Sequence, residues 1–194
     1  MNNNSDNQNI DNENHQIFDT SKIKLIVGLG NIGREYINTR HNIGFEFVET
    51  LAKTSKFNEE KKFKAYLHQV EINGYKIYLA KPTTMMNMSG ESVNLISKYY
   101  NIEPNEILIA HDDLDLKLGS YKIQFSKGPR IHNGILSIEN RLGTTKFWRL
   151  RIGVDNRYMA TKDLMSGASY VLSTFKPDEL NVVSKVIYDI IESL

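Results

Sequence analysis

Hydrophobic and polar positions form blocks of two kinds along the chain. Short blocks of continuous or alternating apolar residues predict β-strands, and longer blocks with an apolar residue every three or four positions predict amphipathic helices. Strands are predicted at 24–28, 64–72, 76–80, 107–110, 120–125 and 149–154. Helices are predicted at 42–53, 89–100, 133–142 and 177–193, the last with Pro177 in its first turn.

The order of these elements predicts the fold class. Strands interleave with helices, and the Asn73-Gly74 pair between two strands marks a tight hairpin. Interleaved strands favour parallel pairing, whereas a hairpin adds an antiparallel pair. We therefore predict an α/β fold: a single domain with a twisted mixed sheet, parallel at its centre and flanked by helices on both faces.

The N-terminal region lacks this pattern. Its first fourteen residues are half asparagine, and Lys22 is the first lysine or arginine of the chain. Such a polar segment has too few apolar side chains to build a core. We predict a disordered Asn-rich tail over residues 1–20 and one folded domain over residues 21–194.

Composition excludes several classes of protein. The 194 residues include no cysteine, which rules out disulfides, thiolate zinc sites and cysteine nucleophiles. No apolar run approaches the roughly 20 residues that span a bilayer, and the N-terminus has no signal-peptide pattern. We expect no membrane partner and a cytoplasmic location, with an organelle left open.

Charge is unevenly distributed. The formal net charge is only +1, yet the segment from Lys117 to Lys162 holds ten basic residues and two acidic ones. A basic region of this kind suits a phosphate backbone. Chance unevenness of a solvated surface is the alternative.

The stretch at 28–33, GLGNIG, fits the G-x-G-x-x-G pattern that follows a strand in dinucleotide-binding folds. That fingerprint needs a helix that opens within the glycines and an acidic residue about 20 positions later. Residues 34–40 separate the glycines from the predicted helix, and Lys53-Thr54-Ser55 stands where the acid belongs. We therefore expect no dinucleotide and no other cofactor.

Five motifs carry a resemblance. They are GLGNIGREYINTRHNIGF from Gly28, KPTTMMNMSG at 81–90, HDDLDLKLG at 111–119, HNG at 132–134 and FWRLRIGV at 147–154. In order and spacing the chain resembles the bacterial-type peptidyl-tRNA hydrolases. The resemblance implies a monomeric enzyme that cleaves the ester between a peptide and the 3′ end of tRNA without metal or cofactor. The residues that match the family's site are Asn31, Tyr36, His41, Asn87, Asp112 and Asn133.

The same residues suit ester hydrolysis on chemical grounds. Hydrolysis at neutral pH needs a base with a pKa near 7, and the imidazole of His41 meets that need. Asp112, beyond the predicted strand at 107–110, can accept its other N–H and stabilise the imidazolium that forms. Asn31 and Asn87 can orient the water or the ester, and Asn133 can donate toward the oxyanion. The sequence leaves the division of these roles open.

Other residues are expected to bind the substrate. Tyr36 and Met86 would line the cleft for the peptide, and Lys122, Arg149 and Arg151 would hold tRNA phosphates. Arg149 and Arg151 share one side of a strand, so pairing with acidic residues is the alternative for them. The acids from 112 to 115 lack the spacing of a calcium loop, and we expect no metal.

Two departures from the family bear on substrate binding. The run before the HNG motif, residues 126–131, keeps only Gly128 of the usual glycines, and the chain stops at Leu194 where relatives often continue. Lys127 and Arg130 would then meet phosphates with side chains where relatives use backbone N–H groups. A non-catalytic RNA-binding or assembly factor on the same fold is the alternative. The intact hydrolytic residues favour the enzyme.

Overall fold

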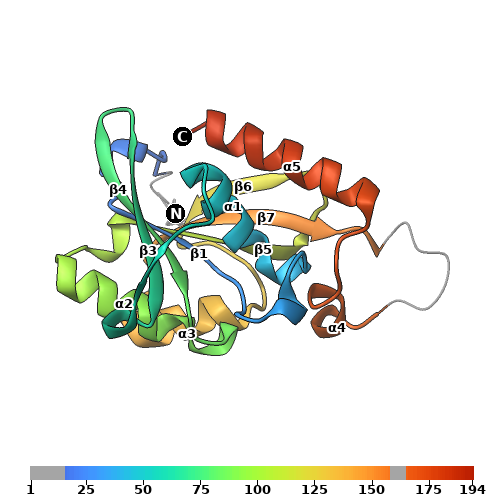
Figure 1. Ribbon diagram of the computed structural model, residues 1–194, viewed down its shortest axis with the longest axis horizontal. Helices are drawn as coiled ribbons and strands as arrows, with labels where there is room; N and C mark the ends of the chain where they lie inside the picture. Colours follow the sequence, from blue (N-terminus) through green and yellow to red (C-terminus); the bar gives the residue numbers. More distant parts are fainter. Residues whose placement is uncertain (1–15, 158–164) are drawn as a thin grey trace, which may run out of the picture.

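The computed structural model describes residues 16–157 and 165–194. Seven strands of this described part form one sheet in the order β2-β3-β4-β1-β5-β7-β6 (Figure 1). The strands are β1 (Leu25–Gly28), β2 (Asn58–Glu60), β3 (Ala65–Ile72), β4 (Tyr75–Pro82), β5 (Ile107–Lys117), β6 (Tyr121–Phe125) and β7 (Trp148–Asp155).

Pairing within the sheet is mixed, as predicted. Strand β1 runs parallel to both β4 and β5, and β5 runs parallel to β7. The outer pairs β2-β3, β3-β4 and β6-β7 are antiparallel. The parallel centre therefore lies between antiparallel margins.

Helices cover both faces of the sheet (Figure 1). On one face, α1 (Ile43–Ala52) and α5 (Pro177–Glu192) bury Phe47 and Val183 against Ile26 of β1. On the other face, α2 (Ser89–Tyr100) and α3 (Asn133–Leu142) pack against Leu25 and Val27 of the same strand. Because both faces of β1 are covered, its sequence is apolar throughout rather than alternating. No helix in the described ranges has the length and apolar character to cross a membrane.

Most predicted elements are confirmed, and three differences have physical reasons. Strand β5 continues through Lys117 because His111, Asp112 and Asp113 interrupt its apolar pattern yet are buried with polar partners. Strand β2 is three polar residues and gives no apolar signal. The five-residue helix α4 (Gly167–Val171) is too short to show helical periodicity.

The packed chain begins before Ser21. The ring of Phe18 lies edge-on to Trp148 with 5.1 Å between centroids, and Asp19 caps a 3-10 turn over Thr20–Lys22. Residues 1–15 of the predicted tail lie outside the described residues.

Two glycines let α1 approach the end of β1 and the neighbouring part of β5. A Cβ atom on Gly28 would lie 2.1 Å from the carbonyl oxygen of Gly44, and a Cβ on Gly44 would lie 2.4 Å from that of Ala110. The first turn of α1 therefore sits directly on the carboxyl end of β1 and on Ala110, the β5 residue paired with Gly28. The 3-10 turn η3 (Arg40–Asn42) leads into this helix, so His41 is held above the same edge.

Candidate active site

A cavity of about 490 Å³ opens at the carboxyl ends of the parallel strands. This edge of an open α/β sheet is where ligands usually bind. Its lining comes from the turn after β1, η3, the 3-10 turn η5 (Met86–Met88), β5, the loop before α3 and α4. The lining residues are Asn31, His41, Met85, Met86, Asn87, Asp112, Leu114, Ile131, His132, Asn133, Gly167, Ala168, Val171 and Leu172.

His41 and Asp112 are joined by a hydrogen bond in this cavity. Gly28 at the end of β1 pairs with Ala110, so Asp112 stands two residues beyond the end of β1, beneath η3. The Nδ1 atom of His41 lies 2.8 Å from Oδ1 of Asp112. Because a carboxylate only accepts, Nδ1 carries the proton and Nε2 is the bare nitrogen of a neutral ring. His41 therefore has the tautomer that a base toward water requires.

The carboxylate also sets the protonation of the pair. Burial alone would lower the pKa of His41, but the charge of Asp112 and the hydrogen bond to it outweigh burial and raise that pKa above its ordinary value. Burial alone would raise the pKa of Asp112, yet the two histidines bonded to it hold that pKa well below the usual range. Asp112 is therefore an anion at every pH at which His41 titrates.

A second histidine bonds to the same carboxylate oxygen. Nε2 of His132 lies 3.0 Å from Oδ1 of Asp112, and its Nδ1 accepts N–H bonds from Gly134 and Ile135 at the start of α3. The sequence reasoning gave His132 no role. Its place directly before a predicted helix was the available signal, because helix N-termini need a side-chain acceptor.

The hydrogen bonds of Asn31 show which of its side-chain atoms faces the cavity. Its Oδ1 accepts the backbone N–H of Met86 at 2.8 Å, and Asn42 bonds to both its backbone N–H and its carbonyl oxygen. The side-chain NH₂ group is left for the cavity. Asn31 is therefore a hydrogen-bond donor there, and Asn42, which the sequence reasoning missed, holds it in place.

Of the remaining residues predicted to line the cleft, some line the cavity and one does not. Met86, Asn87 and Asn133 line the cavity. Tyr36 lies in the 3-10 turn η2 (Arg34–Tyr36) and is not among the residues that line this cavity, so its contact with the peptide stays a prediction. The apolar wall consists instead of Leu114, Ile131, Val171 and Leu172, three of which lie in segments without a motif.

Arg149 and Arg151 do not occupy positions suited to the predicted phosphate contacts. They are 3% and 8% exposed. Arg149 donates to Glu139 of α3 and to the carbonyl oxygen of Gly128, and Arg151 donates to Asp113 at 2.6 Å. The alternative of pairing with acidic residues is therefore what the structure shows. The two arginines support the 126–131 loop from beneath.

Other basic residues of this region are accessible. Lys122 on the edge strand β6 and Lys127 in the loop are exposed, and the side chain of Arg130 is 90% exposed. Asp115 accepts the backbone N–H of Arg130 at 3.0 Å. The acids near 113–115 thus bind arginines and the loop backbone.

Arg40 connects the His41 turn to the α4 wall. Its buried guanidinium donates to Glu179 at 2.6 Å and to the carbonyl of Thr174 at 2.7 Å, and it lies 4.2 Å from the ring centroid of Tyr170. The backbone N–H of Arg40 also donates to the carbonyl oxygen of Ser173 at 3.1 Å. Arg40 therefore ties the His41 turn to α4, to the segment after it and to the start of α5.

The ligand-type atoms of His41, Asp112 and His132 lie within 4.8 Å of one another. Each histidine reaches the carboxylate through an N–H, and the other nitrogen of His132 is occupied by two amides. A cation at this point would have to displace both protons. Hydrogen bonds, rather than a metal ion, therefore account for the close approach of these three side chains.

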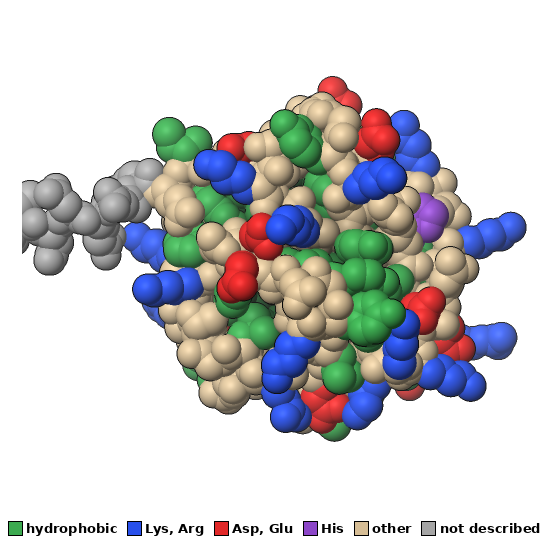
Figure 2. Space-filling view, turned by 90° about the vertical axis from the view of Figure 1, so that its left-hand side faces the viewer, with side chains coloured by type: hydrophobic (Ala, Val, Ile, Leu, Met, Phe, Trp, Pro, Cys, Tyr) green, Lys and Arg blue, Asp and Glu red, His purple; other side chains and the backbone are tan. Residues whose placement is uncertain are grey.

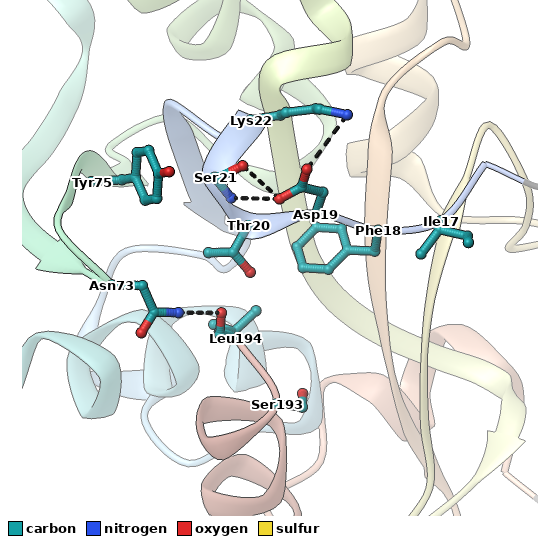
Figure 3. A pocket seen from close by; sticks show the side chains of 10 residues that line it. All are labelled: Ile17, Phe18, Asp19, Thr20, Ser21, Lys22, Asn73, Tyr75, Ser193 and Leu194. Carbon is teal, nitrogen blue, oxygen red and sulfur yellow. Dashed lines mark hydrogen bonds and ion pairs between the residues drawn. The ribbon is translucent and has the colours of Figure 1, made fainter.

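A further cavity, of about 510 Å³, lies at the amino ends of the parallel strands (Figure 3). Its polar groups bond to each other: Asp19 accepts from Ser21 and pairs with Lys22, and Asn73 donates to the carbonyl oxygen of Leu194. No side chain in it is arranged for chemistry.

The face at the left of Figure 1 differs from the basic region. Figure 2 shows Lys and Arg side chains there mixed with Asp and Glu and with hydrophobic groups. Such a mixture produces no field of one sign. This face is therefore poorly suited to a phosphate backbone.

Comparison with known proteins identifies a family for the whole described domain. The family model of peptidyl-tRNA hydrolase matches residues 25–194. Peptidyl-tRNA hydrolase of Desulfitobacterium hafniense is 40% identical over 165 residues, which cover 85% of this chain and 87% of that protein. The protein of the same name from Lactiplantibacillus plantarum is 44% identical over 161 residues, covering 81% and 83%.

Solved structures give the same result. The crystal structure of peptidyl-tRNA hydrolase from Acinetobacter baumannii superposes with a TM-score of 0.79 at 37% identity, covering 89% of this chain and 86% of that one. The likeness therefore extends over nearly the whole described fold.

Proposed function

The chain belongs to the peptidyl-tRNA hydrolase family, and on that premise we propose how its residues act. The protein is an enzyme that hydrolyses the ester bond of peptidyl-tRNA, releasing the peptide and free tRNA. The observation that supports our mechanism best is the His41–Asp112 bond, which leaves a bare imidazole nitrogen at a cavity. A non-catalytic RNA-binding factor would have no need of that pair.

His41 acts as the general base. Its Nε2 removes a proton from a water molecule, and the water oxygen attacks the ester carbonyl carbon. Asp112 stabilises the imidazolium that forms, as the carboxylate of a serine triad does. When the tetrahedral intermediate breaks its bond to the tRNA ribose oxygen, the imidazolium returns the proton to that oxygen.

Asparagine side chains hold the reacting groups. Asn31 presents its NH₂ group to the cavity and donates to a carbonyl oxygen of the substrate. Asn87 and Asn133 stand at the rim, where an amide can hold the water or donate to the oxyanion. The apolar wall, Met86 included, receives the peptide.

The tRNA phosphates bind the exposed basic side chains of β6 and of the 126–131 loop. Lys122, Lys127 and Arg130 are accessible, and the loop that carries two of them also supplies Ile131 to the cavity wall. Contacts of this kind position the substrate without reading its bases. Arg149 and Arg151 act indirectly by supporting that loop.

Alanine substitution of Lys122, Lys127 and Arg130 together is expected to flatten the salt dependence of tRNA binding. Each lost phosphate contact lowers the slope of log affinity against log salt by about 0.7 to 0.9, so the triple variant loses about 2 to 3. Filter binding over a salt series measures the slope. Lys98→Ala, on the far end of α2, is the control, and a triple variant that keeps the control's slope places the tRNA path elsewhere.

The activity itself is tested with two matched substrates. The enzyme should release N-acetylated amino acid from tRNA, whereas the unblocked aminoacyl ester is the comparison. Release is followed by acid precipitation of a labelled amino acid. A purified, folded protein that leaves both esters intact would contradict the function.

We propose that the enzyme works as a monomer in the cytoplasm. Its cavity is lined within one chain, so no second copy is needed to complete it. Its substrate arises where ribosomes work, and that supports the location. An organelle with its own ribosomes meets the same condition.

A further inference from the structure

We propose that His132 is a positioning residue for the hydrolysis, which holds Asp112 for His41 through a second N–H bond and is itself fixed by helix α3. This inference rests on the proposed role of His41. The contact is direct, because both rings bond to one oxygen atom, Oδ1 of Asp112, at 2.8 and 3.0 Å.

Helix α3 determines the tautomer of His132. The N–H groups of Gly134 and Ile135 point at its Nδ1 from 3.1 and 3.3 Å, so this nitrogen must accept and stays bare. The proton then resides on Nε2, which faces the carboxylate. His132 is therefore an N–H donor of fixed direction toward Asp112.

The bond from His132 to Asp112 changes the electrostatic stabilisation of the His41 imidazolium. An N–H that bonds to Oδ1 offsets part of the negative charge that stabilises the imidazolium of His41. Removing this donor leaves more of that charge for His41. The base should then hold its proton to higher pH, and the carboxylate should lose one of the two bonds that fix its rotamer.

Few other groups could produce the same effect. Arg40, on the same turn, points to Glu179, and Glu49 on α1 binds Lys81. His111 on β5 is buried, with Nδ1 donating to the carbonyl of Asp112. The other titratable groups on the elements that contact the turn are Glu46 of α1, Tyr170 of α4, and Asp113, Asp115 and Lys117 of β5. Asp113 and Asp115 pair with Arg151. Within the described residues, only Asp112 is hydrogen-bonded to His41.

Two substitutions separate the two bonds of His132. In His132→Asn the amide lies two bonds beyond Cβ, where Nδ1 was, so it can cap α3 but not reach Asp112. In His132→Gln the amide lies one bond further, where Nε2 was, so its NH₂ can reach Asp112 but cannot cap. The Asn variant tests positioning and the Gln variant tests the structural role.

The pH profile of kcat/KM distinguishes the two roles. We expect His132→Asn to lower kcat severalfold and to move the acid limb upward by about 0.5 to 1 pH unit, with an unchanged urea midpoint. His132→Gln should keep the parent's acid limb and unfold at lower urea. A parental acid limb in His132→Asn, or equal shifts in both variants, would overturn the proposal.

Nitrogen NMR gives an independent readout on the folded parent enzyme. Histidine labelled with ¹⁵N should show His132 as the Nε2–H tautomer, with a large upfield Nε2 shift relative to Nδ1. A protonated ring or the Nδ1–H tautomer would refute the assignment. If His41→Ala stayed active, the base assignment would fail instead, so the two failures differ.

Discussion

Replacing His41 by alanine is expected to lower kcat about 10²- to 10⁴-fold, the range that a positioned general base contributes. The bare Nε2 of His41 is the nitrogen that the structure presents to the cavity as a base, because the two other histidines near it are bonded or buried. Binding of tRNA should remain near the parent's, since the exposed basic side chains are untouched. Single-turnover hydrolysis of N-acetylaminoacyl-tRNA, together with filter binding, measures both quantities.

The matched control for this variant is His68→Ala. His68 lies in β3 against the ring of Phe57 and is not among the cavity-lining residues, so its removal should leave kcat unchanged. A His41→Ala enzyme with turnover close to that of the control would remove His41 from the chemistry. Parallel losses of kcat and tRNA affinity would indicate a damaged fold rather than a missing base.

The fold was predictable where apolar periodicity and pairing partners coincide. The predicted bounds of α2 and α3 agree with the structure because each of these helices has an apolar stripe buried on one face of the sheet. The hairpin followed from Asn73-Gly74, both of which adopt positive φ. Strand β5 was predicted too short because polar residues that find buried partners look like a strand's end.

The sequence predicted only those site residues whose chemical role follows from the residue type alone. His41 and Asp112 could be placed because a base and its acceptor have distinct residue types. That His132 also reaches Asp112 depends on where α3 starts relative to β5, a distance between elements that spacing along the chain does not encode. The placement of the α4 wall depends on Arg40 reaching the carbonyl oxygen of Thr174, which lies 134 residues further along the chain.

The arginines of β7 show why charge alone misleads. A basic residue in a motif looks like a phosphate ligand until its burial is known, and both Arg149 and Arg151 are enclosed with acidic partners. Removing one partner of a buried ion pair costs about 3 to 5 kcal/mol. Alanine at either position should therefore act through the stability of the loop at Gly128, and a binding defect there would be secondary.

The substitution Asp112→Asn is expected to lower kcat by about 10²-fold or more with a smaller change in KM. An amide of the same shape no longer offers a charge to stabilise the imidazolium, and it can turn its NH₂ toward either histidine. The bonds to tRNA are unaffected, so the loss belongs to the chemical step. Steady-state kinetics on N-acetylaminoacyl-tRNA separates kcat from KM, with Asp115→Asn on the same strand as the control for kcat.

The direction in which the acid limb of kcat/KM moves is a second test of Asp112→Asn. Asp112 raises the pKa of His41 against the effect of burial, so removing the charge leaves burial alone and lowers that pKa. The base form then persists to lower pH, and the acid limb of kcat/KM should move downward while the plateau falls. The ratio of parent to variant activity should therefore shrink as the pH is lowered.

This direction is opposite to that expected for His132→Asn, because Asp112→Asn removes the charge and His132→Asn removes a donor that offsets that charge. An Asp112→Asn enzyme whose acid limb moved upward, or whose loss appeared only in KM, would show that the carboxylate holds substrate rather than the base.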